Sequence, residues 1–241
     1  MKALNLTQHQ TNLTNILLEI YKNSALGPFL GFKGGTAARL FYRLPRFSVD
    51  LDFDLITPMP AESETLNHLI KTMTQLLAAK YQIKDQSRKY ATLFWLVSYG
   101  AGLTKIKLEV STRINLFNHY SSIPFYGTTV KILTIEDMIA HKLVALTDRK
   151  TVANRDLFDA HYFLSLPEAA QINYEIIKQR TGKNPEKFYR DLIKFLNRIK
   201  TKNVLAGLGE VLTEAQKDRV KAKLIIELTG LVQRQLDIIK V

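Results

Sequence analysis

A chain of 241 residues, of which 46% are hydrophobic, is long enough to bury a core in one large domain or in two small ones. The absence of cysteine excludes a disulfide framework, a thiolate nucleophile and a zinc–thiolate site, and the five histidines form no i, i+4 pair of the kind that holds zinc on a helix. A formal net charge of +12 favours polyanionic partners, nucleic acid or nucleotides before others, although an excess of basic side chains can also serve solubility alone.

No segment of the sequence has the character of a membrane span or an export signal. It holds no apolar run of the roughly 18 residues that a spanning helix needs. The N-terminal MKALNLTQHQTNL also lacks the order of basic and then apolar residues that marks a signal peptide. We therefore expect a cytoplasmic protein with no membrane partner.

Hydrophobic spacing predicts a mixed α/β arrangement for residues 1–130. A helical pattern covers 5–26 and is broken by Gly27-Pro28, and strict alternation of polar and apolar residues over 48–54 predicts a strand with one buried face. The other elements expected here are a strand at 29–33, helices at 36–44 and 61–80, and strands at 81–88, 90–99 and 103–112.

Strand patterns give way to helical ones in residues 131–241. Thr134-Ile-Glu-Asp has the form of a capping box, which predicts that a helix begins there. The helices expected in this part cover 134–148, 154–166, 168–180, 185–200 and 214–240. We therefore expect an α+β chain of two domains, with a mixed sheet and flanking helices in 1–130 and a helical C-terminal domain in 131–241.

The polar face of the strand at 48–54 carries Asp50, Asp52 and Asp54. Carboxylates gathered on one face repel one another unless a cation sits among them. Mg²⁺ prefers hard oxygen ligands, of which protein carboxylates usually supply one or two, and an Asp-x-Asp on a strand points two of them the same way. The alternative interpretation is an edge strand with a solvated acidic face.

The segment FKGGTAARL places two glycines between a strand and a helix. Backbone N–H groups of Gly34 and Gly35 can turn toward a ligand there, Thr36 adds a hydroxyl donor, and the positive end of the helix favours an anion such as phosphate. Taken alone, a Gly-Gly turn also serves as ordinary punctuation between elements. Next to a strand with three aspartates, it predicts a phosphate cradle beside a metal site.

Three further charged residues are candidates for a phosphoryl-transfer site. Glu109 lies on the polar face of the strand at 103–112 and could supply a third carboxylate, although a surface Lys–Glu ladder explains the same pattern. Lys142 lies within the apolar stripe of its helix, where a cation either finds an acidic or phosphate partner or reaches past the core into solvent. Arg149, seven residues further on nearly the same side, is a second candidate to bind a triphosphate.

Three segments together resemble a known family. In the order FKGGTAARLFYRLPRFSVDLDFDL, KIKLEVSTR and EDMIAHKLVALTDRKTVANRDLFDAHYF, they are similar to the AbiEii-type nucleotidyltransferases, which include the MenT toxins. That family belongs to the DNA polymerase β-like superfamily. The similarity covers roughly residues 29–165, and the later C-terminal helices carry no matching motif.

The resemblance implies a polymerase β-like palm that binds a nucleoside triphosphate (NTP) and Mg²⁺, or Mn²⁺ in its place. It assigns the triphosphate to Gly34, Gly35 and Thr36, the metal to Asp50, Asp52 and Glu109, phosphate to Lys142, and the helical side of the site to Asp156 or Asp159. Many superfamily members carry aspartate where Glu109 stands, and Gly35-Thr36 is a variant of the usual Gly-Gly or Gly-Ser turn.

Members of this family commonly act as toxins of toxin–antitoxin or phage-abortive systems, and some add nucleotides to the 3′ end of tRNA. The resemblance therefore implies transfer of a nucleoside monophosphate from NTP to tRNA, with a cognate antitoxin as a further partner. A basic stripe predicted on the helix at 185–200 could follow an RNA backbone or could be a solvated helix face. Its members are Lys187, Arg190, Lys194 and Arg198.

Two other interpretations stay open at this point. The acceptor could be a small molecule or a protein hydroxyl instead of RNA. Alternatively, the chain could be a catalytically silent protein that binds nucleotide or RNA.

Overall fold

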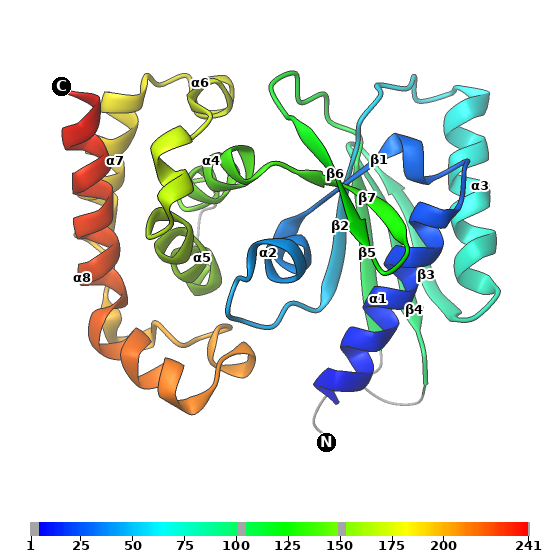
Figure 1. Ribbon diagram of the computed structural model, residues 1–241, viewed down its shortest axis with the longest axis horizontal. Helices are drawn as coiled ribbons and strands as arrows, with labels where there is room; N and C mark the ends of the chain where they lie inside the picture. The colour runs from blue at the N-terminus through cyan, green and yellow to red at the C-terminus, as the bar shows by residue number, and fades with distance from the viewer. Residues whose placement is uncertain (1–4, 101–104, 149–152, 241) are drawn as a thin grey trace. The chain divides into compact units, whose positions relative to one another are not determined.

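The computed structural model describes residues 5–100, 105–148 and 153–240 (Figure 1). The chain forms two compact units, of which unit 1 consists of residues 1–43 and 47–133 and unit 2 of residues 44–46 and 134–241. Arg149, a predicted triphosphate ligand, lies outside the described residues.

Unit 1 is built on one mixed sheet. Its strands are β1 (Leu30–Lys33), β2 (Asp50–Leu55), β3 (Gln82–Lys89), β4 (Thr92–Ser98), β5 (Lys105–Ser111), β6 (Tyr120–Phe125) and β7 (Thr128–Leu133). Its helices are α1 (Leu6–Lys22), α2 (Gly34–Tyr42) and α3 (Glu64–Ala78), with a 3₁₀ turn at Gly27–Phe29. The strand order is β3-β4-β5-β2-β1-β7-β6. β1 is antiparallel to β2 and parallel to β7, while β2 is parallel to β5.

One face of this sheet is apolar and carries the helices. Phe53 of β2 is buried and packs on Phe32 of β1, with ring centroids 5.2 Å apart. Tyr21 of α1 and Phe41 of α2 contact these two rings, and Trp95 of β4 donates a hydrogen bond to α3. Burying one such side chain contributes about 2 kcal/mol, so a one-residue slip in register is strongly disfavoured. The alternating acids of β2 are thereby fixed on the opposite face.

The β6–β7 hairpin is the part of the sheet that the sequence patterns do not predict. Strand patterns were expected to end at residue 130, whereas β7 continues to Leu133. β6 holds mainly exposed or half-buried residues and contains Pro124, as an edge strand can. Tyr126 and Gly127 both have positive φ, at 43° and 77°, which suits a tight hairpin turn but is unusual for tyrosine. Neither feature produces a recognisable pattern in the sequence.

The described part of unit 2 is helical, and with the mixed sheet of unit 1 it confirms the predicted α+β class. The helices are α4 (Ile135–Ala145), α5 (Asn154–Leu164), α6 (Tyr174–Thr181), α7 (Pro185–Leu196) and α8 (Glu214–Ile239), with 3₁₀ turns at Pro167–Gln171, Thr201–Asn203 and Gly209–Val211. None of the described helices is long and apolar enough to cross a membrane.

Two local predictions for unit 2 are wrong. The helix predicted at 168–180 is divided, because Asn173 caps a new helix by accepting a hydrogen bond from the Glu175 backbone N–H. Thr134 does precede α4, but its side chain forms no capping hydrogen bond. In the part of unit 2 that the structure describes, a capping box lies at the start of α8, between Thr213 and Gln216.

Candidate functional site

Three carboxylates occupy neighbouring positions on the polar face of β2 and β5. Asp52 pairs with Glu109 across the parallel ladder, and Asp50 lies two residues earlier on the same face. The side chains of Asp50 and Glu109 are 25% and 33% exposed, so both can meet a ligand. The fold thus brings together acids that come from segments far apart in the sequence.

The surroundings of Asp52 favour a bound cation. Burial raises the pKa of its carboxyl group above the ordinary value, and the negative charge of Asp50 raises this pKa further. Lys107 and Lys33 act in the opposite direction. A buried carboxylate beside a like charge is stabilised in its ionised form by any positive charge that approaches it.

These oxygen donors fit a small, hard cation that brings some of its own ligands. Mg²⁺ takes one or two protein carboxylates and completes its octahedron with water and substrate phosphate. Asp50 and Asp52 supply such a pair from one face of β2. Among the described residues, no group of three or more histidine, aspartate or glutamate side chains is arranged to hold a metal ion by itself. These residues can therefore provide a metal site only where phosphate oxygens complete the coordination.

The turn between β1 and α2 requires glycine and lies against Asp52. Gly34 has a φ of +78°, and a Cβ at this position would come within 2.2 Å of Asp52 Oδ2. The start of α2 therefore packs directly against the Asp52 carboxylate. The first turn of α2 contains no acidic residue, so the partial positive charge of this helix end can act on an anion.

Thr36 has a structural partner that the sequence does not reveal. Its hydroxyl donates a hydrogen bond to the backbone carbonyl of Asp50, and the residue is buried. This bond ties the first turn of α2 to the first residue of β2, so it fixes the glycine turn beside the aspartates. Because its single proton is directed at a carbonyl, the role of Thr36 as a direct triphosphate ligand stays a prediction.

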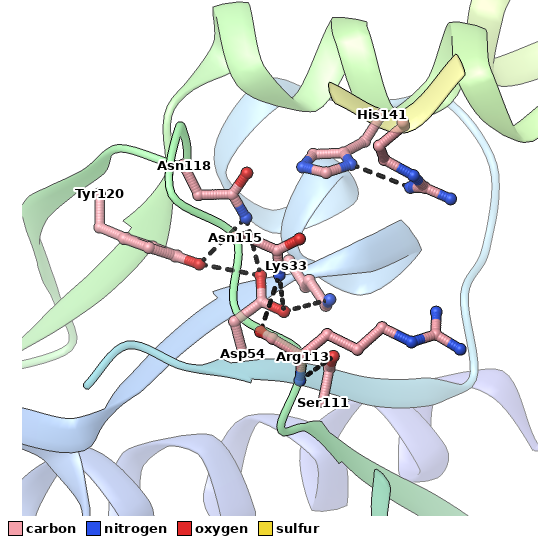
Figure 2. Close-up of polar contacts among 9 residues, drawn as sticks. Lys33, Asp54, Ser111, Arg113, Asn115, Asn118, Tyr120 and His141 are labelled. Carbon is pink, nitrogen blue, oxygen red and sulfur yellow. Dashed lines mark hydrogen bonds and ion pairs between the residues drawn. The ribbon is translucent and has the colours of Figure 1, made fainter. Parts of the chain in front are cut away.

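Asp54 differs from the two other aspartates on its strand. Its carboxylate is 2% exposed and forms an ion pair with Lys33 (Figure 2). It also accepts hydrogen bonds from Tyr120 Oη at 2.8 Å and from Asn118 Nδ2 at 3.2 Å. Tyr120 fits there because Gly31 has no side chain; a Cβ on Gly31 would come within 2.1 Å of the tyrosine ring. Asp54 therefore anchors the start of β6 to the sheet.

Within unit 2, Lys142 has an acidic partner. Its Nζ lies 2.6 Å from Oδ2 of Asp159, which is fully buried. Arg46 also donates to both oxygens of Asp159, at 2.5 and 2.6 Å. Burial alone raises the pKa of Asp159, but the charges of Lys142 and Arg46 outweigh burial and hold this pKa below its usual value. Asp156, one turn earlier, is buried as well.

The predicted basic stripe lies on the exposed side of α7. Lys187, Arg190 and Lys194 are exposed there, and Arg198 is exposed just beyond the helix end. Arg190 forms an ion pair with Glu186 at 2.7 Å, so its charge is partly neutralised. The opposite side of α7 is buried through Phe188, Leu192 and Leu196.

Comparisons with known proteins agree with this architecture. The family described as "Nucleotidyl transferase AbiEii toxin, Type IV TA system" matches residues 15–227. JHP933 from Helicobacter pylori aligns with a TM-score of 0.62 at 21% identity, covering 99% of this chain and 95% of that one. A second H. pylori structure, provisionally assigned as a nucleotidyltransferase, has a TM-score of 0.60 at 22% identity, with 99% and 98% covered. At these identities the two structures show a common fold. No curated protein matches the chain.

Proposed function

Because this chain belongs to the AbiEii family of nucleotidyltransferase toxins of type IV toxin–antitoxin systems, we propose that it transfers a nucleoside monophosphate from an NTP to the 3′ end of tRNA. The single observation that carries the proposal is the position of Asp50 and Asp52 beside the glycine turn of α2. A metal-binding pair of acids and an anion-binding helix end then act on the same triphosphate.

Asp50 and Asp52 would hold Mg²⁺ or Mn²⁺, with Glu109 as a further ligand. Such an ion, when bound, neutralises charge on the phosphates and lowers the pKa of a hydroxyl that it ligates. The position of Glu109 directly across the ladder from Asp52 supports this assignment. Glu109 is partly exposed, so it could equally accept the proton of the acceptor hydroxyl.

In the proposed reaction, the acceptor hydroxyl attacks the α-phosphate in line. A new phosphate ester bond forms, the bond between the α- and β-phosphates breaks, and pyrophosphate leaves. The backbone N–H groups of Gly34 and Gly35 would bind the departing phosphates, because they begin a helix whose first turn lacks acidic residues. Catalysis of this kind depends mainly on position and on charge neutralisation.

The family resemblance also assigns Lys142 to phosphate and Asp156 or Asp159 to the helical side of the site. The ion pair between Lys142 and Asp159 supports a lysine that is kept charged and held in one position. Arg149 keeps its predicted role as a second triphosphate ligand.

RNA is the acceptor that the charge of the chain favours, since a net charge of +12 attracts a polyanion at long range. The exposed cations of α7 supply local contacts of the right sign. A type IV toxin–antitoxin family implies a cognate antitoxin, which we propose as a functional partner in the cytoplasm.

The test is incorporation of each of four labelled NTPs into a tRNA pool in the presence of Mg²⁺, followed by sequencing of the extended 3′ ends. Asp50→Asn and Asp52→Asn keep the side-chain shape and remove the charge, so incorporation should fall by about a hundredfold or more. Asp85→Asn, an exposed position on β3, is the matched control and should keep full activity. Undiminished activity in either β2 variant would exclude the metal assignment.

A further inference from the structure

Lys107 lies between two of the proposed metal ligands. It is the cross-strand neighbour of Asp50, and its Nζ lies 3.1 Å from Asp50 Oδ2. The same Nζ lies 3.3 Å from Glu109 Oε2. One ammonium group on β5 thus joins a carboxylate of β2 to a carboxylate of its own strand.

The surroundings keep this lysine charged. Its ammonium group lies close to two carboxylates, and such neighbours favour the charged form. The side chain is 34% exposed, so the ammonium group can leave the carboxylates without crossing the core. A partly exposed cation therefore occupies the acidic cluster.

We propose that Lys107 is a built-in counter-ion that competes with the divalent metal for Asp50 and Glu109, so that metal binds tightly only together with a nucleoside triphosphate. The inference rests on the proposed metal site. Its physical basis is that the ammonium group and the metal ion need the same carboxylate oxygens and repel each other at short range.

A triphosphate relieves this competition because it brings several negative charges. Its oxygens ligate the metal and can also accept hydrogen bonds from the displaced ammonium group. The arrangement would keep Asp50, Asp52 and Glu109 from holding a metal when no substrate is present, and it would make metal and nucleotide binding mutually reinforcing.

Lys105 provides a matched control on the same strand. It lies two residues before Lys107, on the same face of β5, and it pairs with Ser98 of β4 instead of with an acid of β2. It is exposed. Replacing either lysine by methionine removes one positive charge and leaves a side chain of similar length, so only the local effect differs.

The experiment titrates the full-length protein with Mn²⁺, and electron paramagnetic resonance of free Mn²⁺ reports the bound fraction without any catalysis. We expect Lys107→Met to bind Mn²⁺ about five- to tenfold more tightly than the wild type in the absence of nucleotide. Lys105→Met should stay within about twofold of the wild type. With a non-hydrolysable NTP analogue present, the wild type and Lys107→Met should bind Mn²⁺ with similar affinity. Lys107→Gln serves as a second variant if methionine impairs folding.

Two results separate this inference from the proposed function. In the first, the wild type binds Mn²⁺ and Asp52→Asn abolishes this binding, but Lys107→Met leaves it unchanged or weakens it. This result overturns the counter-ion role and keeps the metal site. A loss of nucleotide affinity in Lys107→Met with unchanged Mn²⁺ affinity also overturns it, because Lys107 would then be a simple phosphate ligand. If neither the wild type nor Lys107→Met binds Mn²⁺, with or without the analogue, the metal site and this inference are overturned together.

Discussion

Charged side chains of this protein meet their partners across different elements. Lys107 of β5 faces Asp50 of β2, and Lys33 of β1 faces Asp54. In unit 2, Asp159 of α5 is shared by two cations that come from α4 and from the segment after α2. Because removing one member of a buried pair leaves an uncompensated charge, the buried Asp159 cluster can be tested by a single substitution.

Asp159→Asn should lower the free energy of unfolding by about 3 kcal/mol at neutral pH, because the buried Arg46 and the partly buried Lys142 would lose their carboxylate partner. Urea denaturation followed by circular dichroism measures the change. Asp218→Asn, an exposed position on α8, removes the same charge and should change the stability by less than about 0.5 kcal/mol. A loss equal to that of the control would mean that this buried pair contributes nothing.

The same substitution makes a prediction about pH. The folded-state pKa of Asp159 lies below its unfolded value, so its contribution is fully present above the unfolded pKa and is lost as the pH falls toward the folded one. The stability difference between wild type and Asp159→Asn should therefore be constant from about pH 5 upward and should shrink below about pH 4. A difference that grows on acidification would contradict the depressed pKa.

Local periodicity in the sequence predicts most helices and strands, but it does not predict which strands pair or in which register. The alternation in β2 and the glycine turn before α2 identify Gly34, Asp50 and Asp52 from neighbouring residues alone. The pairing of Asp52 with Glu109 depends on a register between distant segments, which no local pattern encodes. The ion pair of Arg46 with Asp159 cannot be predicted for a similar reason, since a single basic residue after a proline carries no periodic signal.

Helix α7 tests whether the acceptor is a polyanion. Lys187→Ala combined with Lys194→Ala removes two exposed cations that face away from the buried side. If RNA lies along them, affinity for tRNA should fall, and the slope of log affinity against log salt should become shallower by about 1.5. Filter binding between low and moderate salt measures both quantities.

Helix α8 offers the matched control for α7. Lys221→Ala combined with Lys223→Ala removes the same net charge from exposed positions of the same unit. An equal change in both double variants would show that only the total charge matters. Affinity that does not depend on salt would favour a small neutral acceptor over RNA.

The division of the chain into units does not follow the sequence in a simple way. Residues 44–46 belong to unit 2, although they stand between α2 and β2 of unit 1. Leu44 is buried, and Arg46 binds Asp159. A segment between α2 and β2 therefore belongs to the helical unit. The predicted division into two domains stays a prediction. It can be tested by a substitution in residues 44–46, which belong to unit 2 although they lie between elements of unit 1.

Arg46→Met should separate the unfolding of the two units. Trp95 is the single tryptophan of the sequence and is buried in unit 1, so its fluorescence reports on that unit. Most helical residues lie in unit 2, which dominates circular dichroism at the helix band. We expect the helical transition of Arg46→Met to move to lower urea while the fluorescence transition stays near its wild-type midpoint. Arg155→Met, an exposed position on α5, should move neither. A common shift of both signals would show instead that the two units unfold as one cooperative body, with Arg46 stabilising the protein as a single domain.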